Sequence, residues 1–199
     1  MSIKWNDRYA AEGYFYGREP NDFLVSVAHK IPPGPVLCLA EGEGRNAAFL
    51  AQGGWAVTAV DMSDVGLSKA RSLAAERGLQ ITTVVADLAE FEIEQAAWSG
   101  IVSVWAHLPP EIRIPLHSAC VRGLSPGGVF VLEAYRPEQL DLGTGGPPRA
   151  DLMMDRESLT RELSGLELEI AREVCRDISE GCGHQGPSAT VQVLGVRKA

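Results

Sequence analysis

Short apolar runs alternate with amphipathic segments along most of the chain. Buried strands are expected at runs bounded by turn residues, namely 36–40, 55–60, 81–86, 101–105 and 129–135. Helices are expected between them, from the glycines at 42 and 44 to Gln52, from Ser63 to Gly78, at 90–98 and at 110–123. Ser63 is a candidate N-cap, and Gly78 is typical of the residue after a helix. The alternation predicts parallel β-α-β units, and therefore an α/β fold with helices on both faces of a doubly wound sheet.

The pattern changes after residue 137. A loop rich in glycine and proline at 137–149 and a short helix near 155–163 precede two strands, 166–175 and 190–196. No helical pattern separates these strands. Their connection is short enough for an antiparallel hairpin, so the sheet is expected to end in one antiparallel strand.

Composition limits the function classes. The chain has 199 residues and is expected to form one domain, 1–199, with an N-terminal helical segment, 1–30, ahead of the core, 31–199. Its net charge of −8 disfavours a nucleic acid or an anionic membrane as partner. No apolar run approaches the roughly 20 residues that span a bilayer, which predicts a soluble, cytoplasmic protein. The four cysteines show no CxxC spacing, so reduced thiols and no metal site are expected.

Candidate chemistry lies just after the predicted strands, because open α/β sheets bind ligands beyond the carboxyl ends of their strands. Gly42 and Gly44 lack the Cβ atoms that would block a ligand, and the following helix offers free N–H groups. The spacing is that of a dinucleotide loop, although a tight turn without a ligand has the same pattern. Asp61 is placed to accept both hydrogen bonds of a ribose diol, or to cap a helix. Asp87, followed by Leu88, suits an adenine amine and ring face, or a second cap.

Several segments occur in the order found in class I S-adenosylmethionine-dependent methyltransferases: VLCLAEGEGRN at 36–46, AVD at 59–61, ADL at 86–88 and LSPGG at 124–128. With YGREPNDFL at 16–24 and EGCGHQG at 180–186, the chain resembles the small bacterial branch of tellurite-resistance and thiopurine methyltransferases. The resemblance runs from about residue 5 to the C-terminus. It implies a Rossmann-like sheet of seven strands with the last antiparallel, in agreement with the hairpin. It also implies methyl transfer from S-adenosyl-L-methionine to a small molecule, with S-adenosyl-L-homocysteine as product.

The resemblance also implies roles for individual residues. The methionine half of the cofactor would be held by the loop with Ala40, Glu41, Gly42, Gly44 and Asn46. Asp61 would bind the ribose, and the adenine would be enclosed by Met62, Asp87 and Leu88. Residues 1–30 would form a lid, with Tyr16 nearest the cofactor. The chain departs from the family pattern at Cys38, where an acidic residue is common, and at Ala40, where a glycine is. Glu41 would replace the missing acid if its side chain points inward.

The segment after the fourth predicted strand bears on the acceptor. Amino-group methyltransferases acting on DNA carry an Asn/Asp-Pro-Pro-aromatic motif where this chain has Leu108-Pro109-Pro110-Glu111. The changes at Leu108 and Glu111 remove an acceptor and a stacking partner, which disfavours nucleic-acid methylation. Methyl transfer depends mainly on positioning and exclusion of water, and a base is needed only for a protonated nucleophile.

Histidine is the natural candidate for that base, because imidazole titrates near neutral pH. His107 and His184 are the candidates, and a structural hydrogen bond is an equally good interpretation of each. His29 and His117 are predicted on the surfaces of helices.

Two other functions remain open at this level. A nicotinamide-dependent oxidoreductase would share the glycine loop and Asp61, but the terminal hairpin and the lack of a separate substrate domain disfavour it. A non-catalytic S-adenosylmethionine binder is compatible with the departures at Cys38 and Ala40. The expected partner is a small molecule, the expected state is a monomer or homodimer, and no residue specifies the acceptor.

Overall fold

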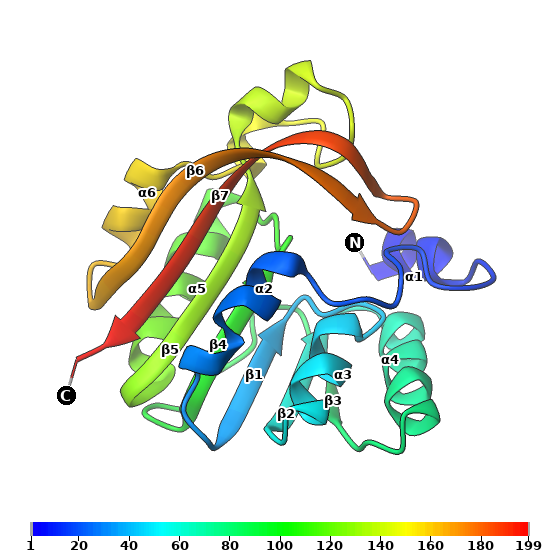
Figure 1. Cartoon of the computed structure of the whole chain (residues 1–199), viewed down its shortest axis with the longest axis horizontal. Helices are drawn as coiled ribbons and strands as arrows, with labels where there is room; N and C mark the ends of the chain where they lie inside the picture. The colour runs from blue at the N-terminus through cyan, green and yellow to red at the C-terminus, as the bar shows by residue number, and fades with distance from the viewer. Residues whose placement is uncertain (1, 199) are drawn as a thin grey trace.

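The computed structural model describes residues 2–198, in which one mixed sheet forms the centre of the molecule (Figure 1). Its strand order is β3-β2-β1-β4-β5-β7-β6. The parallel strands are β1 (Pro35–Leu39), β2 (Ala56–Asp61), β3 (Thr82–Val85), β4 (Trp98–Val104) and β5 (Leu124–Tyr135). β7 (His184–Arg197) runs antiparallel between β5 and the edge strand β6 (Leu166–Glu180). The predicted seven-stranded sheet with a final antiparallel strand is confirmed.

Helices cover both faces of the sheet because successive strand residues point to opposite sides. In β1, Val36 and Cys38 pack into the apolar cluster under α2 (Asp22–Val27), α3 (Arg45–Gln52) and α4 (Asp64–Glu76). Leu37 and Leu39 pack into the cluster under α5 (Pro110–Gly123) and α6 (Arg156–Glu162). The remaining helices are α1 (Ser2–Tyr9), which contacts α4, and the 3-10 turns η1 (Ala28–Lys30), η2 (Pro137–Asp141) and η3 (Ala150–Leu152).

The predicted helix ends agree with the structure where a local signal marks them. Ser63 caps α4 by accepting a hydrogen bond from the N–H of Gly66 at 3.0 Å. Gly78 follows α4 with a φ of +70°, the left-handed conformation that favours glycine. The predicted helix at 110–123 coincides with α5.

The helix expected at 90–98 is wrong. The chain is irregular there until β4 begins at Trp98. Phe91 and Ile93 pack against the apolar cluster under α5, whereas Glu92 and Glu94 are exposed, which is the two-residue period of an extended chain.

The terminal hairpin is longer than its sequence predicted. β6 and β7 stay paired until Glu180 faces His184, so residues 181–183 alone connect them. The distal part of this hairpin arches over the carboxyl edge of the sheet toward α1 (Figure 1). The hairpin therefore brings residues near 180 to the edge where β1 and β2 end. Among residues 2–198, no helix is long and apolar enough to cross a membrane.

Candidate functional site

The loop between β1 and α3 needs glycine at two positions. Gly42 and Gly44 have φ values of +61° and +88°. A Cβ on Gly42 would lie 2.6 Å from the hydroxyl of Tyr9, and one on Gly44 would overlap Ala70 of α4. Ala40 also adopts a positive φ, +49°, where the resembling family has glycine. The loop is thus folded as the glycine pattern predicted.

Glu41 points inward from this loop. Its carboxylate accepts a hydrogen bond from the N–H of Ala47 at 2.8 Å, at the start of α3, and burial, together with the charge of this carboxylate, raises the pKa of the Cys38 thiol. Burial raises the pKa of Glu41 to about 7, against the opposing effect of the Ala47 N–H and Arg45. A carboxylate therefore stands at the end of β1 although the strand itself carries Cys38.

Asp61 fastens the end of β2 to the glycine loop. Its two carboxylate oxygens accept hydrogen bonds from the N–H groups of Gly42, at 2.9 Å, and Ser63, at 2.8 Å. The side chain is 6% exposed, and this burial raises its pKa against those backbone donors. Each oxygen retains a second lone pair, so Asp61 can still accept from a diol.

The other predicted cofactor residues lie at neighbouring strand ends. Met62 follows β2 and is partly buried, and Leu88, near the end of β3, is buried. Asp87 is exposed and accepts a hydrogen bond from the N–H of Ala89. Asn46 differs, because its side-chain oxygen accepts a hydrogen bond from the N–H of Asn21 at 2.9 Å. The side-chain oxygen of Asn46 thus anchors the N-terminal part of the chain and does not point toward the predicted cofactor position.

The N-terminal segment, residues 10–20, connects the glycine loop with the tip of the β6–β7 hairpin. The N–H of Tyr16 donates to Glu43 of the loop at 3.3 Å, and the N–H of Cys182 donates to the carbonyl of Phe15 at 2.7 Å. Arg8 of α1 donates to the Tyr16 hydroxyl at 2.7 Å and lies over the ring of Phe15. No sequence motif marks Arg8, because its approach to Tyr16 depends on the packing of α1 beside residues 10–20.

His107 is held by the backbone through both ring nitrogens. Nδ1 lies 3.0 Å from the carbonyl of Trp105, and Nε2 accepts from the N–H of Tyr135 at 2.9 Å. This pairing fixes a neutral ring with its proton on Nδ1. Burial and the nearby His184 lower the pKa of His107 well below its ordinary value.

His184 is differently placed, among aromatic rings. We call Tyr16, Trp105, Tyr135 and His184 the aromatic cluster. The ring centroid of His184 lies 4.7 Å from that of Tyr16, 4.8 Å from Trp105 and 5.4 Å from Tyr135. Burial lowers the pKa of His184, and the carboxylate of Glu180 partly offsets that effect. The ring is therefore neutral near pH 7 and able to take up a proton.

A network of buried charged residues, centred on Glu180 and Glu133, lies next to the aromatic cluster. Glu180 accepts hydrogen bonds from Arg45 of α3 at 2.5 Å, the Trp105 indole at 2.7 Å and Asn21 at 2.9 Å. Asn21 also donates to Glu133 of β5 at 2.6 Å, and Arg176 binds both oxygens of that carboxylate. Burial pushes the pKa of Glu180 upward, but His184, Arg45 and Trp105 outweigh it and lower the pKa to about 2. Through Arg45, the network joins the start of α3, directly after the glycine loop, to the hairpin.

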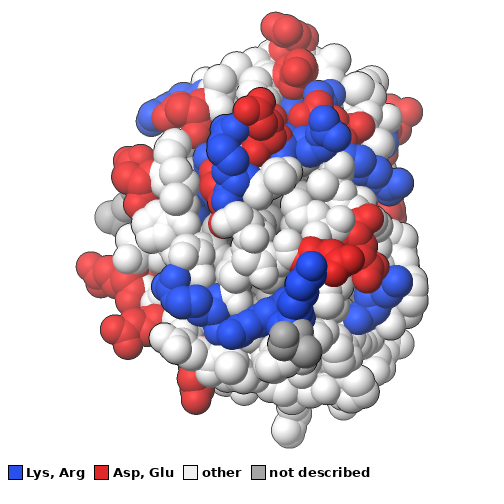
Figure 2. Space-filling model, turned by 90° about the vertical axis from the view of Figure 1, so that its left-hand side faces the viewer, with Lys and Arg blue, Asp and Glu red and all other residues white. Residues whose placement is uncertain are grey.

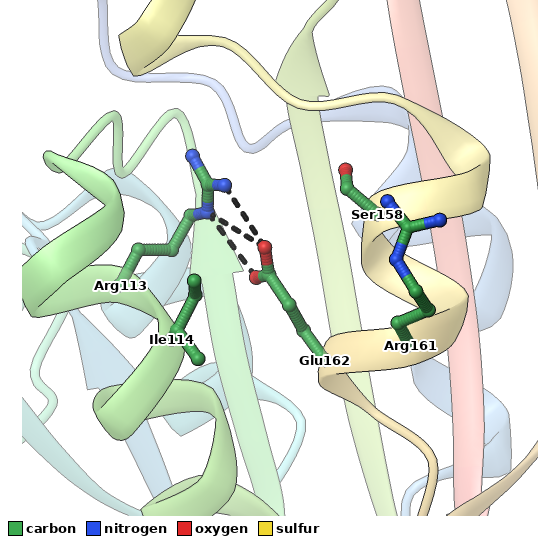
Figure 3. Close-up of a pocket in the computed structure, with 5 residues that line it drawn as sticks. All are labelled: Arg113, Ile114, Ser158, Arg161 and Glu162. Atoms are coloured by element: carbon green, nitrogen blue, oxygen red, sulfur yellow. Dashed lines mark hydrogen bonds and ion pairs between the residues drawn. The ribbon is translucent and has the colours of Figure 1, made fainter.

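A surface hollow of about 370 Å³ lies elsewhere, between α5 and α6 (Figure 3). Arg113 binds the Glu162 carboxylate with two nitrogens, and His117 Nδ1 lies 2.6 Å from it. The prediction of a surface position for His117 is wrong, because the ring is 2% exposed and pairs with a carboxylate 45 residues away. These groups tie α5 to α6. Among the described residues, no group of three His, Cys, Asp or Glu side chains is arranged to hold a metal ion.

Comparison with known proteins agrees with this geometry. Residues 36–128 match the family described as "Methyltransferase domain". A 2-heptyl-1-hydroxyquinolin-4(1H)-one methyltransferase from Mycobacteroides abscessus is 27% identical over 134 residues, which cover 66% of this chain and 59% of that protein. The chain thus spans less than two thirds of this relative's length.

Solved structures show the same fold over the whole chain. TehB from Haemophilus influenzae superposes with a TM-score of 0.75 at 19% identity, covering 99% of this chain and 67% of TehB. The N-methyltransferase NodS from Bradyrhizobium japonicum, solved with S-adenosyl-L-homocysteine, superposes with a TM-score of 0.71 at 13% identity, covering 100% and 98%. Residues 36–128 thus match a methyltransferase domain, and the whole chain has the fold of these S-adenosylmethionine-dependent methyltransferase structures.

Proposed function

We propose that this protein transfers a methyl group from S-adenosylmethionine to a small-molecule acceptor. The observation that carries the proposal is the convergence of Glu41, Gly42 and Asp61 where β1 and β2 end. When bound, the cofactor supplies a methyl group activated by its sulfonium charge. The protein's task is then to orient the two reactants for in-line displacement and to exclude water.

The residues at the strand ends fit the groups of this cofactor. Glu41 would accept from its ammonium group, and the Arg8 fork would bind its carboxylate. Asp61 would accept from the ribose hydroxyls. Met62 and Leu88 would contact the adenine faces, with Asp87 toward its amine. The glycine loop with Ala40 and Gly44 would let the methionine half approach the backbone, and Asn46 would hold the covering segment in place.

His184 is our candidate for the base, in preference to His107. Both nitrogens of His107 are occupied by backbone groups, which supports its structural alternative. His184 is buried beside Glu180 and Tyr16, and its Nδ1 has no hydrogen-bond partner. We infer that His184 takes the acceptor's proton when the acceptor arrives protonated.

Calorimetry with S-adenosylmethionine and S-adenosylhomocysteine tests the proposal. We expect micromolar binding of both, and Asp61→Ala is expected to weaken it by about 1.5–3 kcal/mol through loss of hydrogen bonds to a charged group. Asp177→Ala, an exposed carboxylate on β6, is the control and is expected to leave binding unchanged.

The absence of heat and of a thermal shift with both ligands would refute the proposal. Binding of NAD(H) instead would favour the oxidoreductase, and binding without turnover of labelled cofactor would favour the non-catalytic binder. Four properties remain predictions of the sequence. They are a cytoplasmic location, an activity like that of the tellurite-resistance methyltransferases, a small-molecule acceptor in place of nucleic acid, and a monomeric or dimeric state.

A further inference from the structure

The aromatic cluster gathers residues from distant parts of the chain at one end of the sheet. Tyr16 comes from the N-terminal segment, Trp105 follows β4, Tyr135 ends β5 and His184 begins β7. Trp105 stacks on Tyr135 with ring centroids 4.5 Å apart and an interplanar angle of 29°. Trp105 has a φ of +59°, which bulky residues rarely adopt. Such strain is typical of positions held for function.

Two polar atoms of the cluster are buried without a partner. The Tyr135 hydroxyl and the His184 Nδ1 make no hydrogen bond, although these side chains are 0% and 5% exposed. The closest acidic group to that Nδ1 is Glu180, at 3.6 Å. Buried polar groups are normally paired, so two buried polar atoms without a hydrogen bond in one cluster indicate a place that a ligand completes.

The loop after β5 covers these atoms closely. A Cβ on Gly145 would lie 2.8 Å from the Tyr135 hydroxyl, and one on Gly146 would lie 2.9 Å from the Tyr135 ring. Thr144 ties the loop to β7 by donating to the carbonyl of Pro187. Glycine is therefore required where the loop crosses Tyr135, which encloses the cluster on that side.

The cluster carries no unbalanced charge. Arg45 is paired with Glu180, and Arg176 is paired with Glu133. His184 is neutral, because burial lowers its pKa. Arg8 also borders the cluster, because it donates to the Tyr16 hydroxyl, but the proposed function assigns its guanidinium to the cofactor's carboxylate. With Arg8 so occupied, a small inorganic oxyanion would find no free cation at the cluster, and a cationic amine would find no unpaired carboxylate.

We propose that the aromatic cluster is the acceptor subsite and that the acceptor is a planar, uncharged aromatic molecule bearing a weakly acidic hydroxyl. This inference rests on the proposed function. The acceptor ring stacks against Trp105, which stays partly exposed among its aromatic neighbours, and the hydroxyl bonds to Tyr135 and His184. As the acceptor oxygen bonds to the methyl carbon, the carbon–sulfur bond breaks with its electron pair on sulfur. His184 takes the hydroxyl proton and releases it to solvent.

Calorimetry on protein saturated with S-adenosylhomocysteine tests the acceptor class. We expect 2-naphthol to bind about tenfold more tightly than decahydro-2-naphthol, which has the hydroxyl but no aromatic ring. Sodium tellurite is expected to give no heat. Equal affinity for the two alcohols, or binding of tellurite alone, would overturn the inference.

Variants separate the ring from the hydroxyl contact. Tyr135→Phe removes one oxygen and is expected to weaken 2-naphthol about fivefold while leaving 2-methylnaphthalene, which has no oxygen, unchanged. Trp105→Leu is expected to abolish the preference for aromatic alcohols. Tyr14→Phe is the matched control, because its hydroxyl contacts Lys69 outside the cluster. If the Tyr135→Phe protein binds both naphthalenes as the wild type does, the assignment of Tyr135 is contradicted. If the wild type itself does not bind S-adenosylhomocysteine, the proposed function is refuted instead.

Discussion

Cys38 and Glu41 together place a carboxylate at the end of β1. The strand position is filled by a thiol, and the loop position three residues later supplies the acid, with the two side chains in contact. The acid is thus carried by the loop and not by the strand. Because desolvation raises the pKa of this carboxyl to about 7, we expect binding of S-adenosylmethionine to depend on pH.

Glu41→Gln tests that sensitivity. Glu41 has a pKa of about 7, so the carboxylate that attracts an ammonium group is lost as pH falls through that value. We expect wild-type affinity for S-adenosylmethionine, relative to the variant, to rise between about pH 5.5 and about pH 7.5. Calorimetry at both values measures the ratio, and a constant ratio would show that Glu41 does not contact the cationic group.

The same shift affects stability with the opposite sign. A raised folded-state pKa stabilises the ligand-free protein below the unfolded value and loses that contribution as pH rises through about 7. Relative to Glu41→Gln, the wild type is therefore expected to lose stability over that range in urea unfolding. Glu90→Gln, at an exposed carboxyl, is the control and is expected to track the wild type.

At the scale of elements, the N-terminal segment and the tip of the β6–β7 hairpin are in close backbone contact. The N-terminal segment lies against the hairpin tip at Gly181, whose φ is +59° and whose added Cβ would overlap the carbonyl of Phe15. The edge strand β6 carries charged residues along its length, among them Glu167, Glu169 and Arg172. Blue and red groups adjoin on the corresponding side of the molecule in Figure 2. Charged edge strands resist pairing with a second copy.

Gly181→Ala is expected to detach the N-terminal segment from the hairpin. The substitution combines an unfavourable φ, which costs about 1 kcal/mol, with a backbone overlap. Hydrogen exchange of residues 10–20 is expected to accelerate. Gly127→Ala is the matched control, because its φ is +78° but nothing lies within 4 Å of its added Cβ. Equal acceleration in both variants would show that the contact with Phe15 does not hold the segment.

At the scale of the whole molecule, the Arg45–Glu180 ion pair joins α3 to the β6–β7 hairpin. Its partners are 135 residues apart, and the same carboxylate holds Trp105. The start of α3, the end of β4 and the hairpin therefore share one buried network. Breaking such a network leaves uncompensated buried charge, which is strongly destabilising.

Glu180→Gln is expected to lower the free energy of unfolding at pH 7 by about 3 kcal/mol. The pKa of Glu180 is lowered to about 2, so its contribution is present above the unfolded value and is lost as pH falls toward 2. The difference between wild type and variant in urea unfolding should therefore shrink from pH 7 to about pH 3. Glu138→Gln, from an exposed pair with Arg136 at 3.5 Å, is expected to change stability by less than about 0.5 kcal/mol. A variant as stable as wild type at pH 7 would count against the network.

The sequence by itself determined the features that depend on near neighbours. Gly42 and Gly44 marked the turn after the first strand, Ser63 marked a helix start, and the strand–helix alternation predicted the parallel part of the sheet. It also placed Asp61 and Glu41 at strand ends. These signals are local, because backbone sterics and the two periodicities act within a few residues.

Only the tertiary structure decided what the remaining polar residues do. Four features depend on packing between distant parts of the chain. They are the extended path of Phe91 and Ile93, the pairing of His117 with Glu162, the backbone hydrogen bonds of His107 and the approach of Arg8 to Tyr16. The aromatic cluster likewise needs the hairpin to reach the end of β5. Contacts between residues tens to hundreds of positions apart are set by sheet register and burial, and no short pattern along one chain encodes them.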